Sequence, residues 1–170
     1  MKNFAEFMLE CQCIQETSLN RVKSKSDKGG MAIMSAERGD KSKSQNKARS
    51  KQLTKDIRGA GLPGPTKVKG RYTENPGTKD EKKVSEKSYV ISSGKKSKKK
   101  FKKAVAKLGA KYDQDSVLVQ KKGKGGASLT GTSKTSWPGK GKNVKVGKMK
   151  PGRTGEFDTK VKNKTFTYEN

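Results

Sequence analysis

Apolar residues recur at helical spacing in two parts of this chain. In residues 97–112 the apolar side chains Phe101, Val105, Leu108 and Tyr112 are three or four positions apart, and Ser97 is placed as an N-cap. Residues 44–60 show a rougher version of this pattern, followed by glycines and prolines that end a helix. The chain therefore predicts two helices, of which the second is the more regular.

Apolar and polar residues alternate in other parts of the chain, which is typical of strands. In residues 84–92 the alternation places Tyr89 and Ile91 on one face and Glu86 and Ser88 on the other. The other segments that we expect to form strands are 68–72, 116–120, 127–130, 157–161 and 166–168.

The order of these elements predicts an α+β fold, a small helix-strand-strand-helix-strand core with an antiparallel sheet. We expect a long disordered basic N-terminal linker before it and a Gly/Lys-rich loop after it, because both have too few apolar residues to form a core. The predicted division of the chain is a terminal peptide 1–16, a linker 17–43, a core 44–120, a loop 121–155 and C-terminal strands 156–170.

The charge of the chain points to an anionic partner. The 170 residues include 42 Lys and Arg but 16 Asp and Glu, which gives a formal net charge of +26. Of the basic residues 36 are Lys, which favours neutralisation of phosphates over reading of bases. We therefore predict non-specific binding of double-stranded DNA. The candidate contacts are Lys98, Lys99, Lys100, Lys102, Lys103, Lys121, Lys122, Lys124 and Lys140, with Trp137 as a candidate for stacking on a base.

Several kinds of chemistry are excluded or disfavoured by residue type. The chain has no His, so it offers no imidazole base or metal ligand. Cys11 and Cys13 lack the further ligands of a closed zinc site, and no apolar run is long enough to span a membrane. We expect neither a metal nor a cofactor, and no membrane partner.

The N-terminus carries a motif of its own. Residues 1–7 read Met-Lys-x-Phe-x-Glu-Phe, and two hydrophobic-x-Glu tripeptides follow them. This segment resembles the capsid-targeting peptides of large contractile-tailed phages of the T-even type. The resemblance implies packaging into the head and cleavage by a head-assembly protease, between Glu16 and Thr17 or, as second choice, between Glu10 and Cys11.

The rest of the chain also resembles a phage family. The runs GRYTE, EKSYVIS and LGAKYDQDSVL are similar to an uncharacterised small α+β family of marine tailed phages. The matching positions include Asn46, Arg49, Leu53, Gly70, Tyr72, Glu86, Ser88, Gln114, Asp115 and Ser116. This resemblance implies a phage origin and gives no activity.

One group of polar residues could converge in such a fold. Glu86 and Ser88 share a strand face, and Gln114 and Asp115 end the helix that we expect to pack on the sheet. Glu86, Ser88 and Asp115 are therefore weak catalytic candidates, for example for metal-assisted cleavage of a phosphodiester. A structural role for Glu86, paired with a basic residue, is the favoured interpretation.

Together these patterns predict a head-internal virion protein that binds DNA through Lys and is ejected with the genome, and they favour a non-enzymatic role. The alternatives are an injected nuclease or inhibitor of a host defence, or a structural capsid or tail component with basic arms. The expected partners are DNA, the head-assembly protease and scaffold or capsid proteins. The expected location is the capsid interior and then the host cytoplasm, and the oligomeric state is left open.

Overall fold

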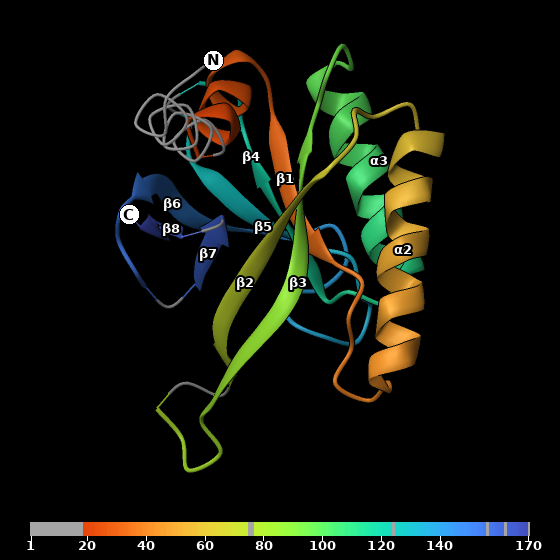
Figure 1. Cartoon of the computed structure of the whole chain (residues 1–170), viewed down its shortest axis with the longest axis vertical. Helices are drawn as coiled ribbons and strands as arrows, with labels where there is room; N and C mark the ends of the chain where they lie inside the picture. Colours follow the sequence, from red (N-terminus) through yellow and green to blue (C-terminus); the bar gives the residue numbers. More distant parts are fainter. Residues whose placement is uncertain (1–18, 75–76, 124, 156, 162, 170) are drawn as a thin grey trace, which may run out of the picture.

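The strands of this protein form one closed antiparallel barrel, with two long helices against its outer surface (Figure 1). The computed structural model describes residues 19–74, 77–123, 125–155, 157–161 and 163–169. The strand order around the barrel is β1-β3-β2-β7-β8-β6-β5-β4. The elements are β1 (Met31–Ser35), α2 (Lys43–Gly59), β2 (Thr66–Glu74), β3 (Lys82–Ser92), α3 (Lys98–Lys111), β4 (Ser116–Gln120), β5 (Ala127–Gly131), β6 (Asn143–Pro151), β7 (Phe157–Val161) and β8 (Lys164–Glu169).

Alternation along each strand divides the apolar residues into two cores. On β3, Val90 faces the barrel interior and packs with residues such as Phe166, whereas Tyr89 and Ile91 face outward to the helices. The outer core fills the space between the barrel wall and the two helices. The barrel interior is therefore a separate compartment from the layer under the helices.

Both helices lie where the apolar spacing predicts them. Leu53 and Ile57 of α2 and Phe101 and Val105 of α3 are almost completely buried against the barrel. Helix α2 begins with a capping box, in which the Ser42 hydroxyl accepts from the backbone N–H of the third helical residue. Helix α3 begins after the predicted cap Ser97, but the Ser97 side chain makes no capping hydrogen bond.

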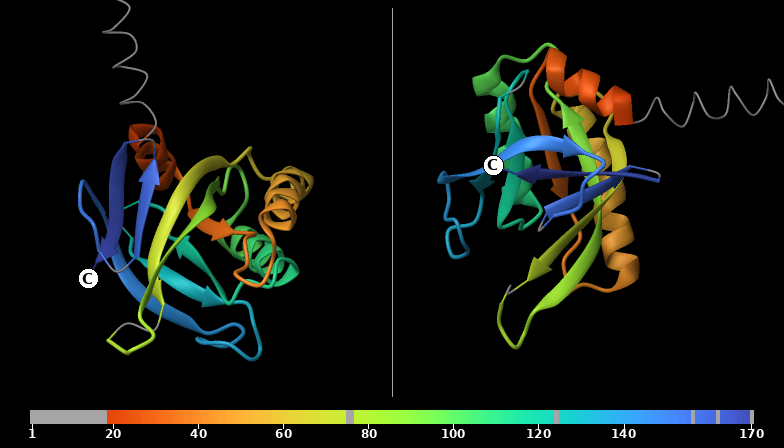
Figure 2. Two further views of the ribbon diagram at one scale, coloured as in Figure 1. Left: turned by 60° about the horizontal axis from the view of Figure 1, so that its bottom comes forward. Right: turned by 90° about the vertical axis from the view of Figure 1, so that its left-hand side faces the viewer.

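The predicted fold class is wrong at the N-terminal side of the core. Residues 19–28 form a helix and 31–35 form strand β1, both inside the segment predicted as a disordered linker. Leu19, Val22 and Ser26, spaced three and four residues apart, are buried over one end of the barrel (Figure 2). A few apolar residues are therefore enough to hold this helix in place, because it only covers the open end of a barrel that the strands form.

The predicted loop after residue 120 is wrong for a second reason. Strand β6 lies within this predicted loop, although the residues of β6 are mainly Lys, Val and Gly. It pairs with β5 on one side and with β8 on the other. Pairing on both edges satisfies its backbone groups, so position in the sheet overrides its low propensity for strand. This strand and β1 complete a closed barrel, which is why the fold is not a small open α+β sheet.

No helix in the described ranges is both long and apolar enough to cross a membrane.

Candidate functional site

The barrel opens into a cavity at the end away from helix 19–28. This cavity has a volume of about 290 Å³. Its wall includes Gly70 and Tyr72 from β2 and Glu86 and Ser88 from β3, which all belong to the faces that point into the barrel. Mouths of β-barrels are frequent ligand sites, because interior side chains from several strands converge there. We call this cavity the barrel mouth.

The loop after α3 forms part of the same wall. Gln114 and Asp115 line the barrel mouth together with Glu86 and Ser88. The structure therefore brings together the four polar residues whose convergence the sequence suggested. Whether Glu86, Ser88 and Asp115 are catalytic stays a prediction.

Two arginines hold the loops around the mouth in place. Arg49 of α2 donates to the carbonyl oxygens of Ala36 at 2.8 Å and of Tyr112 at 2.6 Å. Arg38 donates to the carbonyl oxygen of Asp113. These bonds tie the segment after β1 and the segment after α3 to one helix. The positions of Gln114 and Asp115 therefore depend on α2, which does not itself line the mouth.

Glu86 is the most perturbed carboxyl group at this site. Burial raises its pKa to about 7, and the nearby carboxylates of Glu37 and Glu74 add to this increase. The Ser35 hydroxyl and the Arg38 guanidinium oppose the shift. A carboxyl group with a pKa near neutrality changes charge easily when a cation binds beside it.

Tyr72 and an ion pair complete the wall on the β2 side. Burial and the charge of Glu86 raise the pKa of Tyr72, so its phenol stays protonated. Arg71, which precedes Tyr72 on β2, donates from Nε to Oδ1 of Asp158 at 2.6 Å and from Nη2 to Oδ2 at 3.0 Å. This bidentate pair joins β2 to β7 at the mouth and neutralises both groups. The sequence does not indicate Arg71 or Asp158 as site residues, since no local pattern links residues that lie 87 positions apart.

Trp137 is the one large apolar side chain that is exposed among the described residues. It is 65% exposed, lies in the loop between β5 and β6, and lines the barrel mouth. The sequence selected this residue for stacking on a base. The structure places Trp137 in the wall of the barrel mouth, which Glu86 also lines and no described lysine lines.

The charge of the barrel mouth is opposite to that of the molecule. None of the described residues that line it is a lysine, although the chain contains 36. Glu86, Asp115 and Asp158 line it; Asp158 is paired with Arg71, and Asp115 lies 3.9 Å from the Arg38 guanidinium. Glu86 is therefore the carboxyl group of the mouth that is most available to a small cation.

The lysines predicted to contact DNA fall into separate groups. Lys98, Lys102, Lys121 and Lys122 line a second cavity on the outside of the barrel. The others that the structure describes are exposed, Lys99, Lys100 and Lys103 on α3 and Lys140 near Trp137. Lys124 and the predicted cleavage residues Glu10, Cys11, Glu16 and Thr17 lie outside the described residues. The expected contact with double-stranded DNA, and the expected location, stay predictions.

The fold is thus a closed antiparallel barrel, and no described lysine lines the cavity at its mouth. The S-adenosylmethionine lyase family matches residues 32–170 of this chain, so the chain belongs to that family. Among solved structures, a phage SAM lyase in complex with S-methyl-5'-thioadenosine is 20% identical. The match has a TM-score of 0.41 and covers 64% of this chain and 91% of that chain. No curated protein matches this chain. The family assignment therefore rests on the family match alone.

The family match overturns the functional interpretation of the sequence. The chain is not identified as a head-packaged protein with an uncharacterised core, because residues 32–170 match a family of S-adenosylmethionine-degrading enzymes. A role as a DNA-binding virion or capsid protein is therefore wrong, and the nuclease, inhibitor and structural alternatives do not fit either. The prediction was wrong because it rested on the high net charge, which reflects the surface of the molecule and not its cavity.

Proposed function

We propose that this protein cleaves S-adenosylmethionine at the barrel mouth without adding water. The match of residues 32–170 to the S-adenosylmethionine lyase family is the observation that carries the proposal. The charge of the mouth supports it, since S-adenosylmethionine has a sulfonium and an ammonium group against one carboxylate and is a net cation. An acidic mouth in a basic protein favours this substrate over anionic nucleotides.

The reaction needs only the substrate and a shaped site. The bond between sulfur and Cγ breaks, both electrons go to sulfur, and S-methyl-5'-thioadenosine leaves as a neutral thioether. The four-carbon fragment is then completed in one of two ways. Its own carboxylate oxygen bonds to Cγ and closes a lactone, or a base removes a proton from Cβ and a double bond forms. Each route balances without water.

Glu86 fits a binding role at the ammonium group. The positive charge on sulfur disappears during cleavage, so a carboxylate beside sulfur would stabilise the substrate more than the transition state. Beside the ammonium group, whose charge does not change, a carboxylate binds substrate and transition state equally. A bound cation also lowers the raised pKa of Glu86 and keeps it ionised.

Aromatic side chains on opposite parts of the wall fit the adenine ring. Trp137 is exposed at the mouth and Tyr72 is half-buried within it. Aromatic faces hold purine rings by stacking and also attract cations. We assign Trp137 to the adenine and Tyr72 to the reacting end of the substrate, because the charge of Glu86 acts on Tyr72.

Incubation of the purified protein with S-adenosylmethionine tests the proposal. We expect S-methyl-5'-thioadenosine and a four-carbon lactone or alkene in equal amounts, identified by mass spectrometry. Formation of S-adenosylhomocysteine, or no turnover, would contradict the proposal. Reaction in ¹⁸O-labelled water separates cleavage from hydrolysis, because the first four-carbon product of a lyase contains no solvent oxygen.

The Glu86→Gln variant tests the assigned role. We expect KM to rise about tenfold or more while kcat changes by less than about threefold, since uniform binding is lost. Glu81→Gln is the matched control, because Glu81 is exposed in the β2–β3 connection and does not line the mouth. A fall in kcat with unchanged KM would instead make Glu86 the base that removes the Cβ proton.

A further inference from the structure

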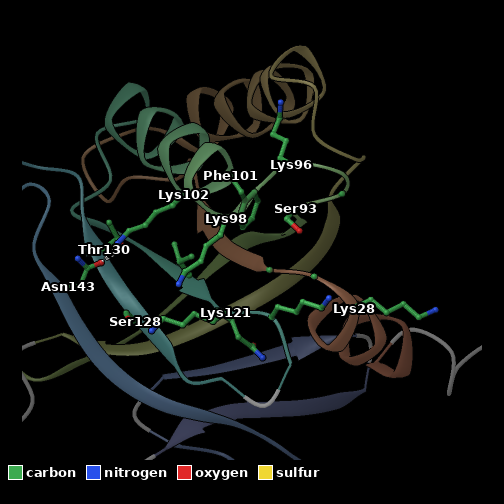
Figure 3. Close-up of a pocket in the computed structure, with 16 residues that line it drawn as sticks. Lys28, Ser93, Lys96, Lys98, Phe101, Lys102, Lys121, Ser128, Thr130 and Asn143 are labelled. Atoms are coloured by element: carbon green, nitrogen blue, oxygen red, sulfur yellow. Dashed lines mark hydrogen bonds between the residues drawn. The ribbon is translucent and has the colours of Figure 1, made fainter.

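A second cavity lies on the outside of the barrel, between the first turn of α3 and strands β4 and β5 (Figure 3). Its volume is about 290 Å³, and it shares no described lining residue with the barrel mouth. The two cavities use opposite faces of the same wall, since Leu118 of β4 lines the mouth and the next residue, Val119, lines the second cavity. We call this second cavity the lysine cavity.

Lysines from three separate segments converge on it. Lys28 comes from helix 19–28, Lys98 and Lys102 from α3, and Lys121 and Lys122 from the end of β4. None of the described residues that line the cavity is acidic, and no ion pair involving these five lysines occurs in the described part of the chain. Like charges held this close together repel one another unless an anion lies between them.

The lysine side chains on α3 are directed to the cavity. Figure 3 shows Lys98 and Lys102 extending from the helix toward the strands, whereas Lys96 points away from them. Lys102 donates to Oδ1 of Asn143 at 2.7 Å, which fixes its ammonium group at the wall and leaves it two further protons to donate. Lys102 is thus pre-positioned, while Lys98 is exposed and free to move.

The first turn of α3 adds positive potential to the same place. It contains Lys98, Lys99 and Lys100 and no acidic residue, and the Ser97 side chain forms no cap. Lysines at the N-terminus of a helix are unfavourable because the helix dipole is positive there. The first backbone N–H groups of a helix also have no partner within it. An anion at this position would relieve both costs.

A hydroxyl group in the wall adds a further donor to the cavity. Ser93 lines the cavity, and no hydrogen bond of its side chain occurs within the described part of the chain. Its oxygen faces Gly29, where an added Cβ would lie 2.7 Å from it. An acceptor in the cavity would supply a partner for Ser93.

We propose that the lysine cavity binds a small anion with two or more phosphate groups, such as a nucleoside polyphosphate. Lysines and the α3 N-terminus would neutralise the phosphates, and Ser93 would donate to one phosphate oxygen. The cavity floor is apolar, formed by buried Phe101 and by Val119, which would accept the flat face of a nucleoside. A cavity floor of this kind fits a small molecule, whereas a duplex backbone requires a continuous basic surface.

This site is independent of the proposed function, and binding at it is measured without turnover. Isothermal titration calorimetry with inorganic tripolyphosphate, ATP and a short DNA duplex uses the full chain at one fixed salt concentration. The cavity variant is Lys98→Gln/Lys121→Gln/Lys122→Gln. The control, Lys99→Gln/Lys103→Gln/Lys107→Gln, removes the same charge from exposed positions on α3 that do not line the cavity.

We expect the cavity variant to bind tripolyphosphate at least tenfold more weakly and the control to change affinity by less than threefold. Ser93→Ala should weaken binding about threefold or more while leaving the melting temperature nearly unchanged. Tighter binding of ATP than of tripolyphosphate would support nucleoside recognition by the floor, and equal binding would support recognition of the phosphates alone.

Two results would overturn the proposal. Equal losses in the cavity variant and the control would show a response to net charge only. Tighter binding of the duplex than of ATP, with the same dependence on the cavity lysines, would make the cavity part of a nucleic-acid surface. Cleavage of S-adenosylmethionine should be unchanged in the cavity variant, so failure of this proposal and of the lyase proposal are separate outcomes.

Discussion

At the scale of single residues, the position of Glu86 determines its chemistry. In a chain with 42 basic residues a carboxyl group would ordinarily be surrounded by cations and have a low pKa. Glu86 instead lies in a barrel interior without lysines, where burial raises its pKa to about 7. The carboxyl group of Asp56 behaves oppositely, because hydrogen bonds from Lys111 and Tyr112 lower the pKa of Asp56 to about 2.

The raised pKa of Glu86 predicts a pH-dependent loss of stability. Its folded-state pKa of about 7 exceeds its ordinary value of 4.5, so ionisation is harder in the folded protein. The cost is absent below pH 4.5, grows between pH 4.5 and 7, and is complete above pH 7, at on the order of 3 kcal/mol. Glu86→Gln cannot ionise and should be more stable than the parent above pH 7 and equally stable near pH 4.

Urea denaturation at several pH values measures this difference. Glu81→Gln is again the control, since Glu81 is exposed and does not line the mouth. A constant difference between Glu86→Gln and the parent at all pH values would show that packing, rather than ionisation, separates the two proteins.

Gly70 lies at a position of the mouth where a larger residue would crowd its neighbour. A Cβ at this position would lie 2.8 Å from the Ser88 hydroxyl oxygen. Gly70→Ala should therefore push the Ser88 side chain into the mouth and raise KM for S-adenosylmethionine about tenfold, with little change in stability. Gly39→Ala is the control, because a Cβ there meets nothing within 4 Å. Equal kinetics for the two variants would show that the substrate does not occupy this part of the cavity.

At the scale of elements, helix α2 acts as the support for the loops of the site. Arg49 bonds to carbonyl groups of two segments, and its guanidinium also lies 5.6 Å from the centre of the Tyr112 ring. Ala36 and Tyr112 lie just outside the neighbouring strand and helix. Helix α2 therefore contributes to the candidate site by orienting the loops around it.

Removal of Arg49 should destabilise the protein and disturb the site together. Arg49→Ala removes the donor to the carbonyl group of Ala36 and the shorter of two donors to that of Tyr112, which also accepts from the Gln114 amide. We expect a cost of about 2–4 kcal/mol in the free energy of unfolding. Lys51→Ala on the same helix is exposed and should cost less than about 0.5 kcal/mol. Urea denaturation measures both, and equal effects of the two substitutions would contradict a supporting role for Arg49.

At the scale of the whole molecule, a closed barrel holds together a chain whose charges repel. The net charge of +26 opposes compaction, and the barrel leaves no strand edge open among the described strands. Few acids oppose the repulsion, and four of the ion pairs among the described residues have both side chains more than a third exposed, which makes these pairs weak. Closure of the sheet and the two apolar cores therefore carry the stability.

This balance predicts that salt stabilises the protein. Raising sodium chloride from about 20 mM to about 200 mM shortens the Debye length to less than about 10 Å and weakens the repulsion. The urea midpoint should increase over this range. The same measurement on a variant with five exposed lysines changed to Gln should show a smaller increase, and an equal or greater increase would contradict repulsion as the cause.

The sequence alone determined the elements with strong local patterns. Apolar spacing predicted α2 and α3, and alternation predicted β2, β3, β4 and the C-terminal hairpin, because each of these patterns depends on neighbours along the chain. The same alternation placed Glu86 and Ser88 on one face. It also suggested that Gln114 and Asp115 lie near them.

Tertiary structure decided the closure of the barrel and the sign of charge at the site. Strands β1 and β6 form because the sheet supplies partners on both sides, which residues 31–35 and 143–151 do not reveal locally. The pair Arg71–Asp158 forms only when β2 meets β7, and Trp137 and Glu86 line one cavity only when the β5–β6 loop reaches the mouth. Composition averages charge over the whole chain, whereas folding directs the lysines outward and leaves a few carboxyl groups at an interior opening.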